Sequence, residues 1–230
     1  MKAFVTAICV FFCAASSATA ADDKNAAAAP AKERDGLPLV FHEDFKDAEK
    51  ARARFGFDDP DAWKMIQDNG KNVLALVKRS NYKPPVRSIE NRAWIKDLEI
   101  AGPFVMEVKL RSTIRDYGHR DMCLMFGLVD DSHHYYVHLG KVADPNCNNI
   151  FLVDGAPRKN IATKVSTGTP WDDAYHTVRL VRDETTTKVY WDDEHVMTAE
   201  TTKFPTGRLA VGAFDDTGNF AEITVWGKRK

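Results

Sequence analysis

Short apolar runs recur along most of the chain, and turn residues separate them. Within residues 104–114 apolar side chains stand at every second position, at Phe104, Met106, Val108 and Leu110, and the polar Glu107, Lys109 and Arg111 alternate with the last of them. A period of two is that of a β-strand with one buried face. Similar runs rich in β-branched and aromatic residues predict about a dozen strands. They are expected at 38–45, 63–67, 73–78, 104–114, 121–129, 134–140, 149–153, 175–182, 188–192, 195–199, 208–214 and 220–226.

Turn residues indicate where the strands reverse. Asp68-Asn69-Gly70 stands between two predicted strands, and Asn-Gly accepts the positive φ angles of a tight hairpin turn. The one stretch with helical character is 47–55. Many short strands with turns between them favour an antiparallel β-sandwich or barrel, in which a single domain of about 200 residues is ordinary.

The first residues have the pattern of an export signal. Lys2 precedes an apolar run at 4–14 that is too short to span a bilayer, and Ala18-Thr19-Ala20 has the form of a cleavage site. We therefore predict a signal peptide at 1–20, cleaved after Ala20, and a secreted or periplasmic protein. The Ala-rich, charged segment at 21–36 is predicted to be a flexible leader. The folded body is then 37–230, and it contains no run long enough for a membrane span.

The composition of the chain limits which classes of molecule it can bind. Hydrophobic residues make up 44% of the chain, as in globular proteins, and 32 Lys and Arg balance 33 Asp and Glu. This balance lacks the basic excess of a nucleic-acid-binding protein. Removal of the signal peptide leaves Cys123 and Cys147. In an exported protein these two form either one disulfide or two buried thiols, and the sequence leaves both possibilities open.

Several segments resemble one superfamily of β-sandwiches. The meander YHTVRLVRDETTTKVYWDDEHV at 175–196, the close RLAVGAFDDTGNFAEITVWG at 208–227, the opening VFHEDF at 40–45 and the central HYYVHLG at 134–140 are similar to strands of the concanavalin A-like lectins and glucanases. Laminin-G-like domains and the bacterial 3-keto-disaccharide hydrolase-like family are the related groups. The resemblance implies an all-β jelly roll of two curved antiparallel sheets, whose concave face often holds glycans.

The function that this resemblance implies is recognition of a glycan or oligosaccharide. Two alternatives remain open. One is a glycoside hydrolase like the 3-keto-disaccharide hydrolase family, and the other is a non-catalytic structural or adhesion module like laminin G. The glucanase signature E-x-D-x-x-E is absent from the sequence. Fold alone does not decide between these functions.

Strand parity selects candidate residues. We take 104–114 and 121–129 as a hairpin and place 134–140 beside its second strand. Matching the polar faces gives three rows across one face of this sheet, with neighbours in a row about 5 Å apart and the rows about 7 Å apart. The rows are Glu107, Gly127 and Tyr136; Lys109, Met125 and His138; and Arg111, Cys123 and Gly140. The residues expected to share that face are Glu107, Lys109, Arg111, His134, Tyr136 and His138.

These residue types suit a sugar site. Glu107 and His138 are the candidate catalytic acid and base. The candidate substrate-binding residues are Lys109, Arg111, Tyr136 and His134, with Tyr136 as a ring on which a sugar stacks. The competing interpretation is a solvated sheet face with cross-strand ion pairs. A one-residue slip of register would move every one of these side chains to the other face.

The resemblance also implies a structural calcium ion where the first and last strands meet. The matching positions are Glu43, Asp215 and Glu222. Their carboxylates are hard oxygen ligands of the kind that calcium prefers. The family has Asp where this chain has Glu222, and solvated turn carboxylates are the alternative interpretation.

Overall fold

The computed structural model describes residue 1 and residues 29–230. The predicted signal peptide and most of the predicted leader lie outside the described residues. Within the described part there are one short α-helix, α1 (Ala48–Ala53), one 3-10 helix, η1 (Pro60–Ala62), and 16 strands. None of the described helices is long and apolar enough to cross a bilayer.

The strands follow the order of the chain. They are β1 (Glu33–Arg34), β2 (Leu37–Glu43), β3 (Phe55–Phe57), β4 (Trp63–Asp68), β5 (Lys71–Leu76), β6 (Asn91–Ser112), β7 (Asp121–Asp130), β8 (His133–Gly140), β9 (Asn149–Asp154), β10 (Lys159–Asn160), β11 (Ala162–Val165), β12 (His176–Arg182), β13 (Thr186–Trp191), β14 (Glu194–Glu200), β15 (Thr206–Ala213) and β16 (Gly218–Arg229).

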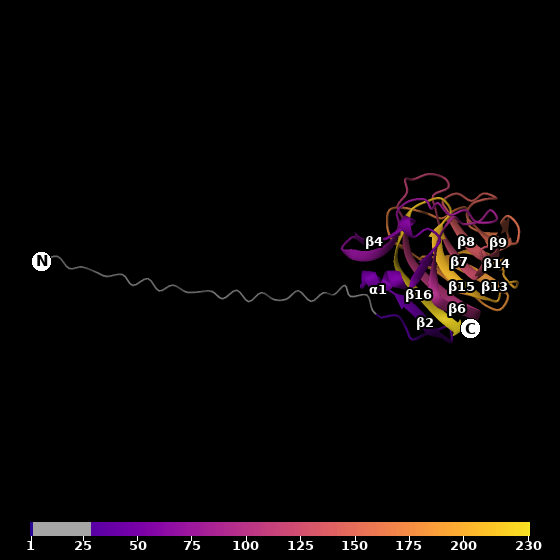
Figure 1. Cartoon of the computed structure of the whole chain (residues 1–230), viewed down its shortest axis with the longest axis horizontal. Coiled ribbons are helices and arrows are strands. Elements are labelled where there is room, and N and C mark those ends of the chain that lie inside the picture. Colours follow the sequence, from indigo (N-terminus) through magenta and orange to yellow (C-terminus); the bar gives the residue numbers. More distant parts are fainter. Residues whose placement is uncertain (2–28) are drawn as a thin grey trace.

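The strands pack as two antiparallel layers, which is the all-β sandwich that the sequence predicted (Figure 1). The first layer runs β10-β9-β8-β7-β15, continues through the first half of β6 and ends on β3. The second layer runs β14-β13-β12, the second half of β6, and then β16. Beyond β16 this layer continues into β2 and into the β5–β4 hairpin.

β6 is the strand that joins the two layers. Residues 91–101 pair with β15, whereas residues 104–112 pair with β12 and β16. Between the two halves Gly102 has a φ of 71° and Pro103 has no N–H to donate. The ladder can therefore break and the strand can bend from one layer into the other.

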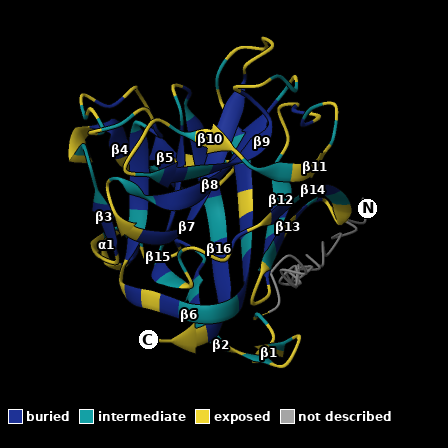
Figure 2. Cartoon of the chain, turned by 90° about the vertical axis from the view of Figure 1, so that its right-hand side faces the viewer, coloured by how far each residue is buried: buried dark blue, intermediate teal, exposed yellow. Residues whose placement is uncertain are grey.

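The main core fills the space between the layers. Met106 and Val108 of β6 and Leu124 and Val137 of β7 and β8 all belong to it and are fully buried. Figure 2 shows the buried strand segments at the centre and the exposed positions mainly in the loops. Each such side chain contributes about 1.5–3 kcal/mol by leaving water.

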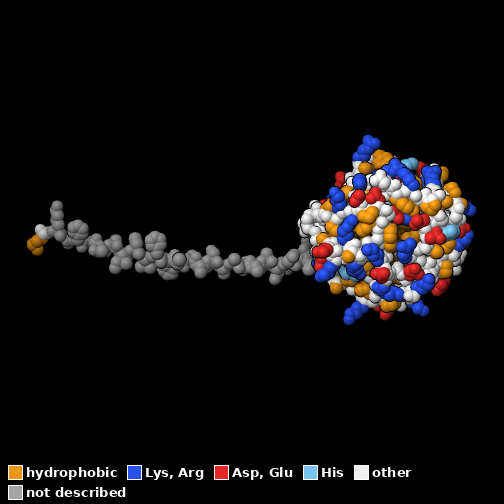
Figure 3. Space-filling view, viewed as in Figure 1, with side chains coloured by type: hydrophobic (Ala, Val, Ile, Leu, Met, Phe, Trp, Pro, Cys, Tyr) orange, Lys and Arg blue, Asp and Glu red, His pale blue; other side chains and the backbone are white. Residues whose placement is uncertain are grey.

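A second apolar cluster covers the outer face of the first layer. Cys123, Met125, Tyr136 and Phe151 point away from the main core, and Ile89 from the β5–β6 loop lies against them. That loop therefore closes part of the face that the resemblance would leave open for a glycan. On the surface view of Figure 3, acidic and basic side chains are interspersed, as the balanced charge predicted.

Several local predictions are confirmed. The Asn69-Gly70 turn joins β4 to β5, and both residues have positive φ, of 50° and 75°. The helical stretch predicted at 47–55 contains α1, which Asp47 caps because its side chain accepts a hydrogen bond of 3.2 Å from the Lys50 amide. The leader was predicted to be flexible through residue 36, and this is wrong for its last residues. β1 pairs with β2, and Asp35 and Gly36 turn between them with φ of 53° and 77°.

The predicted hairpin of 104–114 with 121–129 is also wrong. β7 pairs with β8 and β15, and residues 104–112 lie in the other layer. β15 takes the place beside β7 that the hairpin would need, and the first half of β6 pairs with the other edge of β15. Burial explains why the sequence did not reveal that half, since Asn91, Arg92 and Ala93 are buried in succession and show no alternation.

Candidate functional site

The two predicted catalytic residues lie on opposite faces of the sandwich. Glu107 alternates with the core residues Met106 and Val108, so its side chain points outward from the second layer. His138 alternates with core residues of β8 and points outward from the first layer. Glu107 forms an ion pair of 2.5 Å with Arg34 instead. The prediction that Glu107 and His138 form one acid–base pair is therefore wrong.

Lys109 and Arg111 share the face of Glu107. Arg111 forms an ion pair of 2.7 Å with Asp68, and its guanidinium lies 5.2 Å from the centre of the Tyr175 ring. Lys109 is exposed beside them. This outer face matches the competing interpretation of a solvated sheet with ion pairs between strands. The structure does not bring these residues to the side chains of β8.

The three predicted residues of β8 do share one face. The rings of His134, Tyr136 and His138 follow one another at 6.3 Å between centroids. His134 is fully buried and forms a hydrogen bond of 2.7 Å with the Ser88 hydroxyl of the covering loop. Burial lowers the pKa of His134 to about 4, so this ring is neutral and closed to a ligand.

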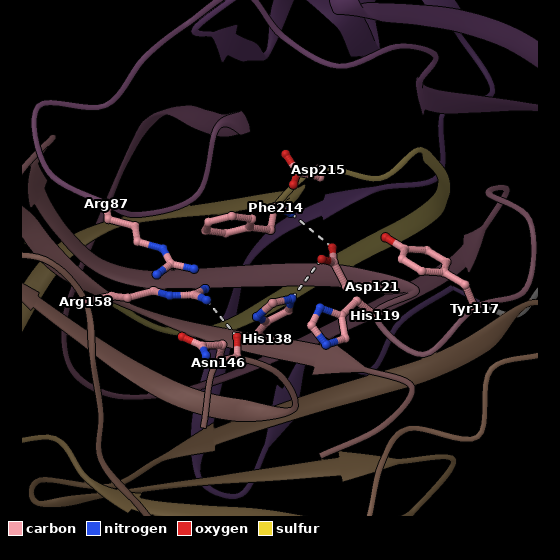
Figure 4. Close-up of a pocket in the computed structure, with 9 residues that line it drawn as sticks. All are labelled: Arg87, Tyr117, His119, Asp121, His138, Asn146, Arg158, Phe214 and Asp215. Carbon is pink, nitrogen blue, oxygen red and sulfur yellow. Dashed lines mark hydrogen bonds and ion pairs between the residues drawn. The ribbon is translucent and has the colours of Figure 1, made fainter. Parts of the chain in front are cut away.

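A pocket of about 280 Å³ opens at the end of the face where His138 stands (Figure 4). Strands β7 and β8 supply its floor, and five loops supply its walls. Because the floor is a hydrogen-bonded sheet, side chains carried on it keep fixed positions. The lining residues are Arg87, Tyr117, His119, Asp121, His138, Asn146, Arg158, Phe214 and Asp215.

His138 and Asp121 form a buried pair at the floor of this pocket. Nε2 of His138 lies 2.8 Å from Oδ2 of Asp121, and each side chain is 4% exposed. The other carboxylate oxygen accepts a hydrogen bond of 3.0 Å from the Phe214 amide. The Phe214 ring stacks on the imidazole at 5.8 Å. These contacts hold the imidazole in one orientation.

This orientation leaves one nitrogen free. A carboxylate only accepts hydrogen bonds, so Nε2 of His138 carries the hydrogen and Nδ1 of the neutral ring is an acceptor. Nδ1 is buried and has no hydrogen-bond partner among the described residues. Figure 4 shows it on the side of the ring that faces Arg158 and Asn146. The arrangement suits a ligand hydroxyl that donates to His138.

Asp121 is the partner that sequence reasoning missed. The predicted rows set Cys123 opposite Gly140, but the structure sets Cys123 opposite His138 and Asp121 opposite Gly140. An irregularity in β7 between Phe126 and Asp130 shifts the register by two residues. A shift of two residues keeps each side chain of β7 on the predicted face of the sheet, but it changes which residue of β8 lies opposite. Gly127, with a φ of 56°, was the sequence feature that could have indicated a bulge.

Carboxylates dominate one end of the pocket. Asp216 lies behind the lining, where it accepts hydrogen bonds of 2.8 Å from the Asp121 amide and 2.6 Å from the Tyr117 hydroxyl. Burial and then the charge of Asp121 raise the pKa of Asp216 to about 6. Burial also raises the pKa of the neighbouring Asp215. This end therefore carries acids that hold protons more tightly than free carboxyls do.

Arg87 and Arg158 occupy the other end of the pocket. The Arg158 guanidinium lies between the rings of Phe151 and Phe214, at 4.6 and 4.4 Å from their centroids. It donates hydrogen bonds of 2.7 Å to the Tyr136 hydroxyl and to the Asn146 carbonyl. The sequence predicted Tyr136 as a stacking platform for sugar, but here its ring stacks on Phe151 and its hydroxyl holds Arg158.

The predicted calcium ligands do not meet. Glu43 forms an ion pair of 2.7 Å with Arg54, and Glu222 lies 3.8 Å from His42. Asp215 stands at the pocket, 3.0 Å from Arg79. Within the described part of the chain, the group of metal-ligating side chains that does converge is Asp121, Cys123 and His138. The set of Glu43, Asp215 and Glu222 is thus not one site.

The cysteines have no bond between them. Cys123 and Cys147, both among the described residues, are free and buried. Burial raises the pKa of the Cys147 thiol to about 12 and that of Cys123 well above its ordinary value. Of the two possibilities that the sequence left open, the structure has two buried thiols.

Comparisons with known proteins agree on the fold. No protein-family model and no curated protein sequence matches the chain. Among solved structures, a carbohydrate-binding module of family 66 from Bacillus subtilis has a TM-score of 0.54 and 15% identity, over 76% of this chain and 96% of that one. The carbohydrate recognition domain of Emp47p has a TM-score of 0.54 and 13% identity, over 85% and 99%.

A third structure similar to this chain is domain 4 of an extracellular arabinanase from Geobacillus stearothermophilus, solved in complex with arabinotriose. Its TM-score is 0.51 at 10% identity, over 84% of this chain and 94% of that one. At such low identities the likenesses concern the fold. The chain has the antiparallel jelly-roll sandwich fold that these structures share, as the resemblance implied.

Proposed function

We propose that this protein binds a carbohydrate in the pocket of Figure 4. The observation that carries the proposal is Nδ1 of His138, a buried acceptor that has no partner among the described residues. An unpaired buried polar atom costs about 1–3 kcal/mol, and a ligand hydroxyl placed against it would recover that free energy. The Asp121 carboxylate keeps this acceptor in place before the ligand arrives.

The rest of the lining suits a sugar. A sugar hydroxyl both donates and accepts hydrogen bonds, and the pocket offers the arginine donors at one end and the acceptor Asp215 beyond the Phe214 ring. Tyr117, which lines the pocket and is 36% exposed, provides an aromatic ring for the C–H groups of a pyranose. A volume of about 280 Å³ is small for a ligand pocket and suits one sugar residue, with further residues outside.

The comparisons support this proposal through the fold. The neighbours described above include one carbohydrate-binding module, one carbohydrate recognition domain and one domain solved with arabinotriose. We also propose that the protein acts outside the cytoplasm, on the basis of the signal-peptide pattern at 1–20. Extracellular or periplasmic glycans would be its ligands.

Glycoside hydrolysis is the second candidate function. The pair of His138 and Asp121 has the geometry of a general base that a carboxylate orients. The raised pKa of Asp215 makes that carboxyl a candidate proton donor on the same pocket. In a hydrolase, Nδ1 of His138 would take a proton from water while Asp215 protonates the leaving oxygen.

A glycan array with the purified protein, followed by calorimetric titration of the strongest ligand, tests the proposal. The variant His138→Phe keeps the ring stack on Phe214 but removes both nitrogens. We expect it to weaken binding at least tenfold, since tenfold corresponds to 1.4 kcal/mol. His133→Phe is the matched control, because His133 stands on the same strand, outside the pocket lining, and is half-exposed.

The possible results separate the two candidates. Binding without release of new reducing ends supports a binding protein, and release that His138→Phe abolishes supports the hydrolase. If no glycan on the array binds, or if His138→Phe binds as tightly as the unchanged protein, the proposed site is wrong.

A further inference from the structure

The pocket is polarised along its length. Figure 4 shows Arg87, Arg158 and Asn146 at one end and Tyr117, His119 and Asp121 at the other, with His138 between them and Asp215 beyond the Phe214 ring. His138, which β8 carries, therefore lies between a cationic end and an acidic end of the pocket. A ligand in this pocket would be oriented by its charge as well as by its hydroxyl groups.

Nothing in the described part of the chain neutralises the cationic end. Arg158 and Arg87 have no carboxylate within ion-pair distance there, whereas Arg92, Arg54 and Arg111 each have one. The polar contacts that Arg158 does make are to neutral oxygens, those of Tyr136 and Asn146. A half-buried guanidinium that has only neutral partners retains its capacity to bind an anion.

The backbone brings the two arginines together. The Arg158 amide donates a hydrogen bond of 3.0 Å to the Arg87 carbonyl, which joins the covering loop to the segment after β9. Phe151 and Phe214 hold the Arg158 guanidinium from both sides, and both arginine side chains line the pocket. Figure 4 shows both guanidinium groups at the same end of the pocket, and an anion placed there would be attracted by both.

We infer that the ligand is an acidic sugar whose carboxylate binds between Arg87 and Arg158, as in a uronic acid residue. This inference rests on the proposed function and names the class of its ligand. A carboxylate matches the two parallel N–H groups of a guanidinium, which a hydroxyl group does not. Nδ1 of His138 then accepts from a hydroxyl of the same sugar, next to the carboxylate.

The acidic side chains of the pocket limit how many charges the ligand carries there. Asp215 repels a second anion near it, and its raised pKa reports that negative charge is already unfavourable at that position. The formal charge of the whole chain is −1 at pH 7, so its surface offers no general attraction for polyanions. Selectivity for the carboxylate would therefore come from the pocket itself.

Titration with chemically matched oligosaccharides tests the inference. The probes are oligomers of galacturonic acid, the same oligomers as methyl esters, oligomers of neutral galactose and sulfated galactose oligomers; guluronic and mannuronic acid oligomers extend the acidic set. We expect an acidic oligomer to bind at least tenfold more tightly than its uncharged counterpart. We also expect the difference to shrink at high salt, because ions screen an exposed arginine.

Arg87→Gln is the variant for this test, because Arg87 is exposed and makes no ion pair in the described structure. It should weaken binding of the acidic oligomer about fivefold or more and weaken binding of neutral sugars by a clearly smaller factor, because only the acidic oligomer loses a charge pair. Arg208→Gln is the matched control, since Arg208 lines a different depression beside β7 and also lacks an ion pair among the described residues.

Each outcome decides between the two proposals. If acidic and neutral oligomers bind equally and Arg87→Gln changes neither, the inference is overturned while the carbohydrate site stands. Preference for sulfated over carboxylated oligomers also overturns it. If none of the probes binds and the array is empty, the proposed function fails as well.

Discussion

The hydrogen bond between Arg158 and Tyr136 gives the sharpest test of how the pocket is built. Tyr136 is 0% exposed, and its hydroxyl accepts a hydrogen bond of 2.7 Å from the guanidinium. Arg158→Met keeps an unbranched side chain against Phe151 and Phe214 but removes every donor. The hydroxyl of Tyr136 and the carbonyl of Asn146 then lose their partner.

The structure sets the size of the effect. Loss of a charged hydrogen bond to a buried oxygen costs about 1–3 kcal/mol, and loss of a partly desolvated cation–π contact costs about 1–2 kcal/mol. The Met side chain recovers part of this through apolar contact with the two rings. We expect Arg158→Met to lower the free energy of unfolding by about 2–4 kcal/mol. In a domain of this size that corresponds to a fall in Tm of roughly 4–16 °C.

Urea denaturation of four proteins measures the interaction: the unchanged protein, Arg158→Met, Tyr136→Phe and the double variant. The coupling energy from this cycle should be about 1–3 kcal/mol, because the second substitution removes a group that the first has already left unpaired. Arg87→Met serves as the control. Its side chain is exposed, so the free energy of unfolding should change by less than about 0.5 kcal/mol.

Two results would refute this account of the pocket. A coupling energy below about 0.5 kcal/mol would mean that the Arg158–Tyr136 hydrogen bond does not contribute to the folded state. An equal loss of stability in Arg158→Met and Arg87→Met would mean that the covering loop, rather than the buried contacts of one arginine, determines the effect.

Three further predictions concern the same layer. Burial lowers the pKa of His134 from about 6.5 to about 4, so as pH falls the unfolded chain binds this proton before the folded protein does. The free energy of unfolding should therefore fall by up to about 3 kcal/mol between those two pH values. Urea denaturation at several pH values should show a smaller fall for His134→Gln, and an equal fall in both proteins would contradict this. Gly127→Ala should destabilise the protein by about 2 kcal/mol or more, because the φ of Gly127 is 56° and a Cβ there would lie 2.9 Å from the Phe204 carbonyl oxygen. Thermal unfolding measures the change, and an unchanged Tm would show that β7 can relax around the added methyl group. Cys123 and Cys147 should react with a thiol reagent only in denaturant, and fewer than two titratable thiols after unfolding without reductant would reveal a disulfide.

Local sequence patterns predicted many of the strands, turns and outward-facing positions of the fold. Alternation in the second half of β6 and in β8 predicted which side chains point outward, and the structure confirms that for Glu107 and for His138. The Asn69-Gly70 turn and the Asp47 cap were also predictable, because each depends on residues close together in the chain. Local periodicity thus indicated strands and faces without any long-range information.

The partners of each strand were not predictable in the same way. The start of β6, from Asn91 to Ala93, is buried at successive positions, so it shows no alternation. β15 pairs with the first half of β6 and with β7, and residues 104–112 therefore lie in a different layer from β7. Because of the irregularity after Phe126 in β7, the residue opposite His138 is Cys123 and not the predicted Met125. Pairing depends on contacts between residues far apart in the chain, and no periodicity within one strand encodes them.

The sequence by itself determined an all-β fold, the turn positions and the outward face of β8. The tertiary structure alone decided that Asp121 orients His138 and that Arg87 meets Arg158. Each of these contacts joins segments that approach only after two layers have packed and a loop has closed over one of them. A binding pocket of this kind is a property of strand register and loop placement, and both arise from the balance of long-range packing rather than from any local pattern.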